Sequence, residues 1–109
     1  MDLYSEIQMK LQEADQRIKQ LAKWGRQKAQ TEHDYKIELT QEVFRLKQGG
    51  HPATLIQLIA YGQPNVAKKR LDRDIADSMW QSCLESINVG KIHIRILENQ
   101  LQREYGKKD

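Results

Sequence analysis

Three histidines and one cysteine are the side chains of this sequence best suited to metal binding or nucleophilic catalysis, and their spacing supports neither. His33, His51 and His93 are scattered along the chain, and Cys83 has no second cysteine to form a ligand pair. No glycine-rich phosphate-binding loop is present, and no serine or cysteine comes with a plausible base. We therefore expect no catalytic residues, no metal and no cofactor, and we do not expect an enzyme.

A cluster of acidic residues, Asp72, Asp74 and Asp77, lies close to Arg70 and Arg73 in the sequence. On a helix, residues three or four positions apart are neighbours, so opposite charges at these spacings form ion pairs. Ion pairing explains this cluster without a ligand.

The most basic segment, KKRLDRD, begins at Lys68. An antiparallel turn of two helices would bring the cations at the end of the first helix to the same place, and such a group can contact phosphates. Against this, Glu42, Asp72 and Asp74 lie in the same region, and no aromatic side chains alternate with the basic ones. Nucleic-acid binding through this basic end is therefore the alternative hypothesis. Its candidate residues are Arg45, Lys47, Lys68, Lys69, Arg70 and Arg73.

The elements that position these side chains are expected to be helices. Only 6% of the 109 residues are aromatic and two are proline, whereas Gln, Glu, Lys, Arg, Leu and Ile are frequent. This composition is typical of long helices, and the length favours one helical domain over residues 1–109. The 18 basic and 15 acidic residues leave a net charge of +3, which is too small an excess to require nucleic acid.

The same composition bears on the cellular location. A single cysteine cannot form an internal disulfide, which favours a reducing compartment. No apolar signal segment follows Met1, and no apolar run approaches the roughly 18 residues of a membrane span. We expect a soluble, cytoplasmic protein.

Two long helices are expected, over about residues 2–48 and about 64–105, because apolar residues recur there every three or four positions. In the first helix these residues are Leu3, Ile7, Leu11, Ala14, Ile18, Leu21, Tyr35, Leu39, Val43 and Leu46. In the second they are Leu71, Ile75, Met79, Cys83, Ile87, Gly90, Ile94, Leu97 and Leu101. Gly25, Lys28 and Glu32 interrupt the apolar seam of the first helix, which predicts a bend, a break or a polar layer there.

A short uncharged segment, ATLIQLIAY, separates the two long helices. Gly49 and Gly50 suit the end of a helix, Pro52 suits the start of the next, and Gly62 and Pro64 repeat this pattern. A short helix over about 52–61 is therefore expected at the turn of an antiparallel hairpin. Its apolar residues are expected to cap the open end of the two-helix seam, and the alternative is that they form an exposed site for a partner. The expected capping residues are Leu55, Ile56, Leu58, Ile59 and Tyr61. The candidate partner-binding residues are Leu55, Leu58, Ile59 and Tyr61.

A hairpin folded about this turn pairs residues whose numbers add up to about 112 to 115, which places Gly25 close to Gly90. Two glycines inside facing helices suggest a close approach of the backbones. The segment INVGKIHIRIL alternates like a strand, but it lies within a longer helical pattern without turn signals, and we favour a helix.

Apolar side chains outside the two stripes predict self-association, because one two-helix seam cannot bury them all. The simplest assembly is a homodimer that forms a four-helix bundle. These additional residues are Trp24, Ile37 and Phe44 on the first helix and Trp80, Leu84, Ile92 and Ile96 on the second.

Three segments, GGHPATLIQLIA, VAKKRLDRDIADSMWQSCLESIN and ILENQLQREYG, resemble small proteins of unassigned function from phages and prophages of low-GC Gram-positive bacteria. The likeness covers nearly the whole chain. Such proteins are typically encoded among early replication and recombination genes. The resemblance implies an all-helical accessory protein of a mobile element, located in the bacterial host cell, with no catalytic residues to transfer.

Two classes of function remain after these steps. The favoured one is a helical protein–protein interaction module that docks on a replication, recombination or host-defence protein. The alternative is nucleic-acid binding through the basic end. The mild net charge and the surplus of apolar surface favour the first class.

Overall fold

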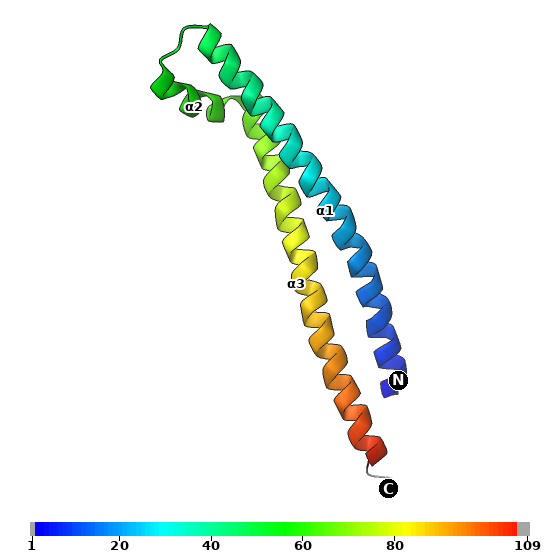
Figure 1. Ribbon diagram of the computed structural model, residues 1–109. Helices are drawn as coiled ribbons and strands as arrows, with labels where there is room; N and C mark the ends of the chain where they lie inside the picture. The colour runs from blue at the N-terminus through cyan, green and yellow to red at the C-terminus, as the bar shows by residue number, and fades with distance from the viewer. Residues whose placement is uncertain (1, 107–109) are drawn as a thin grey trace. The chain divides into compact units, whose positions relative to one another are not determined.

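The computed structural model describes residues 2–106, and its regular structure is helical. Over that range the chain forms three helices and no strand: α1 (Leu3–Gln48), α2 (Ala53–Gly62) and α3 (Pro64–Gly106), as Figure 1 shows. The all-helical class predicted from the sequence is confirmed. The INVGKIHIRIL segment is helical within α3, and α1 continues through Gly25 without a break.

Glycine and proline separate the three helices as the sequence predicts. Gly50 has a φ of +79°, which an L side chain rarely adopts, and the backbone N–H of His51 donates to the carbonyl of Leu46 across it at 3.2 Å. Pro52 comes directly before α2, and Pro64 is the first residue of α3, where its missing N–H leaves no helical hydrogen bond unmade.

Contacts divide the chain into two compact units. The central unit is Trp24–Trp80, and the terminal unit comprises residues 2–23 and 81–106 of the described chain. Each unit contains one part of α1 and one part of α3, and the central unit also contains α2. No helix within residues 2–106 is long and apolar enough to cross a membrane.

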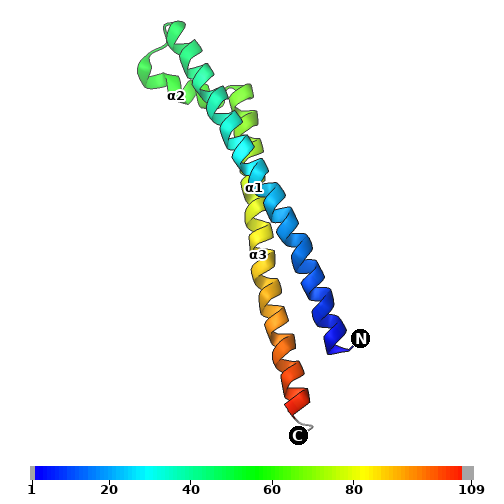
Figure 2. The ribbon, with the colours of Figure 1, turned by 45° about the vertical axis from the view of Figure 1, so that its right-hand side comes forward.

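In the central unit, α2 lies beside the C-terminal part of α1, as Figures 1 and 2 show from two sides. The apolar core lies between these two helices. Ile56 and Ala60 of α2 are buried against Leu46 of α1, and three half-buried residues pack around them. The half-buried residues are Leu39, Val43 and Ile59.

The register of α1 against α3 differs from the prediction. In the central unit, Lys28 pairs with Asp77 and Glu32 with Arg73, so the numbers of facing residues add up to 105 rather than 112 to 115. The reason is that α2 packs back alongside α1. As a result α3 begins opposite Glu38 and Glu42 instead of opposite the end of α1.

The predicted layer of two glycines is therefore wrong. A Cβ on Gly25 would lie 3.5 Å from the Trp80 ring, and a Cβ on Gly90 would lie 3.5 Å from the Arg17 guanidinium. Both distances are ordinary van der Waals contacts with side chains, so neither glycine marks a close approach of two backbones.

The buried face of α3 in the central unit also differs from the prediction. Leu71, Ile75 and Met79, which were expected in the core, are 53%, 50% and 40% exposed. Val66 and Ala76 are buried in their place. The register brings the charged and polar face of α3 against α1, and the predicted apolar stripe consequently lies outside.

In the terminal unit, Arg17 lies beside Gly90, and Glu6 lines a groove with Leu97. These contacts show that α1 and α3 run antiparallel in this unit as well. Ile7 and Ile87 are the buried large apolar residues among the described part of this unit. Leu11 and Ile18, which were expected in the core, are exposed instead.

Candidate protein-interaction site

The short helix α2 has one buried face and one exposed apolar face. Ile56 and Ala60 are four positions apart, so they share a side of the helix, and that side packs on Leu46. Leu55 and Leu58 lie on the other side and are 45% and 72% exposed. Because α2 carries no charged residue, no long charged side chain of its own covers these leucines.

The four candidate partner-binding residues therefore fall into two groups. Leu55, Leu58 and Tyr61 are exposed, whereas Ile59 is half-buried and packs on the core cluster. The prediction that Leu55 and Leu58 cap the seam is wrong, since Ile56, Ala60 and Ile59 fill that position. Sequence reasoning included Ile56 in the cap but gave no means of separating its face from that of Leu58.

Polar contacts fix α2 in place at its C-terminal end. The Arg70 guanidinium Nη1 donates to the carbonyl of Tyr61 at 3.1 Å and lies 5.4 Å from the centre of the Tyr61 ring. The Gln63 side-chain Nε2 donates to the carbonyl of Ile59 at 3.4 Å. The Arg70 contact joins α2 to α3, and the Gln63 contact closes the end of α2, so the exposed leucines are presented on an anchored helix.

The start of α3 is fixed by two glutamates of α1. Glu42 is 3% exposed, and the Asn65 side-chain Nδ2 donates to it at 3.4 Å and also to Glu38. The guanidinium of Arg45 pairs with Glu42 at 2.9 Å, which compensates the buried carboxylate. Sequence reasoning missed this contact, although Glu42 follows the buried Tyr35 by seven residues and so shares its heptad row.

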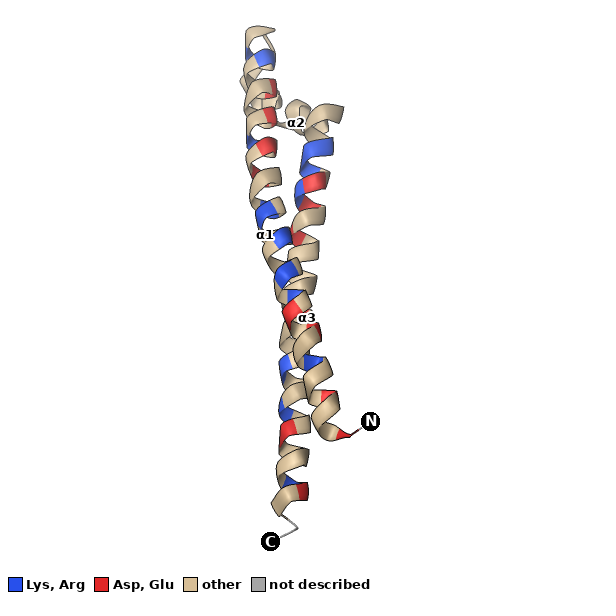
Figure 3. Ribbon diagram, turned by 90° about the vertical axis from the view of Figure 1, so that its right-hand side faces the viewer, with Lys and Arg blue, Asp and Glu red and all other residues tan. Residues whose placement is uncertain are grey.

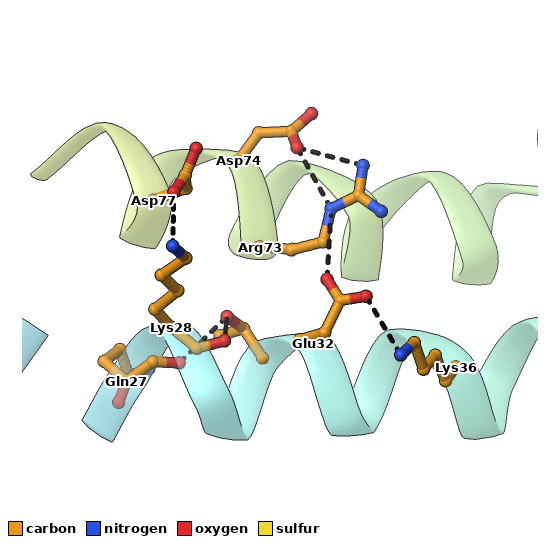
Figure 4. A network of polar contacts seen from close by, with 8 residues as sticks. Gln27, Lys28, Glu32, Lys36, Arg73, Asp74 and Asp77 are labelled. Atoms are coloured by element: carbon orange, nitrogen blue, oxygen red, sulfur yellow. Dashed lines mark hydrogen bonds and ion pairs between the residues drawn. The ribbon is translucent and has the colours of Figure 1, made fainter. Parts of the chain in front are cut away.

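A polar layer joins α1 and α3 where the apolar seam is interrupted, which confirms one of the three predicted outcomes at this place. Figure 4 shows the ion pairs of Lys28 with Asp77 at 3.1 Å, and of Arg73 with Glu32 at 3.7 Å and with Asp74 at 3.1 Å. Two aromatic rings complete the layer. The Lys28 ammonium lies 4.3 Å from the centre of Trp80, and the Arg73 guanidinium lies 4.4 Å from that of Tyr35.

Two groups of this layer, Arg73 and Tyr35, have pKa values above their ordinary ones. Burial lowers the pKa of Arg73, but the hydrogen bond and charge of Asp74 and the charge of Glu32 outweigh it and hold this pKa above its ordinary value. Burial raises the pKa of Tyr35, and a hydrogen bond with Tyr61 raises it further. Both groups therefore keep their usual charge at neutral pH, a charged guanidinium and a neutral phenol.

The basic residues proposed for nucleic-acid binding are mostly engaged within the chain. Lys68 pairs with Asp72 at 2.6 Å, and Arg45, Arg70 and Arg73 make the contacts given above. Lys47 and Lys69 form no ion pair with a described residue. Figure 3 shows the same mixture along both long helices, where Lys and Arg alternate with Asp and Glu.

The side chains with potential for catalysis or metal binding remain apart. His33 lies 3.2 Å from Asp34 on an exposed surface, and Cys83 is a half-buried free thiol. His93 lines an open apolar groove in the terminal unit together with Met9 and Ile96. Across residues 2–106, no three His, Cys, Asp or Glu side chains are grouped so that they could hold a metal ion.

Comparison of the chain with protein families, with curated proteins and with solved structures finds no match.

Proposed function

We propose that this protein is a non-enzymatic accessory protein of a phage or prophage and that it acts as a helical protein–protein interaction module. The observation that carries the proposal is the apolar face of α2, where Leu58 is 72% and Leu55 is 45% exposed. Exposed leucines on an uncharged helix that is held in place by its other face are suited to a hydrophobic groove on a partner. Because α2 is anchored, little conformational entropy is lost on binding.

The chain as a whole is proposed to form an antiparallel hairpin of α1 and α3, with α2 at its turn, that associates as a homodimer. The antiparallel contacts within each unit support the hairpin. The described residues expose seventeen large apolar side chains and bury only eight apolar residues, which supports self-association.

The proposed class of partner is a replication, recombination or host-defence protein of the bacterial cytoplasm. This class follows from the resemblance to phage and prophage proteins given above. The surface chemistry agrees with it, since an uncharged leucine pair fits a protein groove better than it fits a phosphate backbone.

The proposal is tested with the double variant Leu55→Gln/Leu58→Gln in a pull-down from nuclease-treated host lysate, followed by titration of the captured protein in pure form. We expect the variant to bind that protein at least about 30-fold more weakly while its thermal stability changes little. Leu71→Gln/Ile75→Gln, which changes two leucine-sized residues of α3 at similar exposure, is the control and should bind normally. Equal binding by the α2 variant and the wild type would contradict the proposed site.

Nucleic-acid binding is the second candidate function, and the ion pairs of Arg45, Lys68 and Arg73 argue against it. Cations already paired with carboxylates release few counterions when they approach DNA. A mobility-shift titration at low salt decides the matter, because binding that falls steeply with salt would support this alternative.

A further inference from the structure

The apolar seam of α1 consists of two rows of residues, each with a spacing of seven. In the terminal unit the first row is Ile7, Ala14 and Leu21, and the second is Tyr4, Leu11 and Ile18. Helix α3 covers the first row, in which Ile7 is 8% exposed and the other two are half-buried. The second row is open, with exposures of 64%, 42% and 51%.

The continuation of the second row shows what covers it elsewhere. Further along α1 the same spacing leads to Leu39 and Leu46, which lie in the central unit. There Leu46 is 8% exposed and Leu39 is half-buried, because a third helix, α2, packs on them. Between these segments, Gly25 and Glu32 of the same row contact Trp80 and Arg73 of α3, so the third helix covers the row only at Leu39 and Leu46. In the terminal unit the described residues supply no third helix.

We infer that a second copy of this chain supplies the missing helix, and that Tyr4, Leu11 and Ile18 pack against the same three residues of that copy. This inference rests on the proposed self-association and specifies the surface that carries it. The row suits an isologous contact, in which one patch meets its own copy across a two-fold axis, because it is symmetric about Leu11.

Repulsion between like charges favours one orientation of the second copy. Asp15 lies beside the open row, one helical turn after Leu11, and forms no ion pair with a described residue. A parallel arrangement would place Asp15 next to Asp15 of the second copy, which is unfavourable. An antiparallel arrangement centred on Leu11 avoids this repulsion and places Tyr4 opposite the second copy's Ile18.

The test compares Leu11→Gln/Ile18→Gln with a matched pair on the same helix, Ile37→Gln/Phe44→Gln. The control residues are also seven apart and similarly exposed, at 44% and 61%, but they lie outside the row. Sedimentation equilibrium should show a dimer for the wild type and for the control. For the row variant it should show a dimer dissociation constant raised at least about 100-fold, with unchanged helix content by circular dichroism.

A second variant gives a readout that does not depend on the stability of the dimer. In a Cys83→Ser background, Leu11→Cys provides one thiol that the antiparallel arrangement places next to its copy, so mild oxidation should form a covalent dimer. Phe44→Cys in the same background should not. Cross-linking at position 44 but not at 11, or loss of the dimer only in the Ile37/Phe44 control, would overturn the inference while leaving self-association intact. A wild-type chain that stays monomeric at high micromolar concentration would instead refute the proposed self-association itself.

Discussion

The two faces of α2 predict a large and a small loss of stability for two alanine substitutions of similar size. Ile56 is 8% exposed within the cluster of Leu46 and Ala60, so Ile56→Ala leaves a cavity there. Such changes cost about 2–5 kcal/mol, and we expect about 2–3 kcal/mol here because a small cluster at the end of a helix pair can partly close. Leu58 is 72% exposed, so only about a quarter of its surface is removed from water. Leu58→Ala should therefore lower the free energy of unfolding by less than about 0.8 kcal/mol.

The measurement is urea unfolding followed by circular dichroism at a fixed protein concentration, because the stability of an associating protein depends on concentration. Both variants should keep the slope of the wild-type transition, and only Ile56→Ala should shift the midpoint strongly. Equal losses in the two variants would show that both faces of α2 are buried in solution. A larger loss for Leu58→Ala would refute the assignment of the buried face.

Two further predictions follow from contacts in the two units. Gly25→Ala and Gly90→Ala should each stabilise the protein by about 0.5–1 kcal/mol, because alanine favours the helix more than glycine does. The added methyl group fits, since its nearest neighbours would lie 3.5 Å away. A lower melting temperature of either variant would show that the glycine is closely packed instead. The raised pKa of Tyr35 means that the fold prefers the neutral phenol, so its stabilising effect is complete below the ordinary tyrosine pKa of about 10 and is lost as the pH rises through the folded-state value. The melting temperature of wild-type protein should therefore fall more steeply than that of Tyr35→Phe as the pH rises above about 10, and parallel curves would contradict this reading.

Local signals in the sequence determined the three helices and the positions where each one ends. The three-and-four spacing of apolar residues, the positive φ available to Gly50 and the fixed φ of Pro64 act over a few residues, so they can be recognised without tertiary structure. The polar interruption at Lys28 and Glu32 also predicted a polar layer in the correct part of α1. The uncharged α2 segment was identified as the candidate interaction site for the same local reason.

Only the tertiary structure decided which face of each helix is buried. The packing of α2 back along α1 moves the start of α3 to Glu38 and Glu42, and this shift changes the partner of every residue on α3 in the central unit. Ala76 and the paired Arg73 then face α1, while the Leu71 stripe faces outward. An apolar stripe shows that a face can be buried, but the register depends on contacts between residues far apart in the sequence. For that reason the sequence could not separate a stripe that packs within the chain from one left open to a partner.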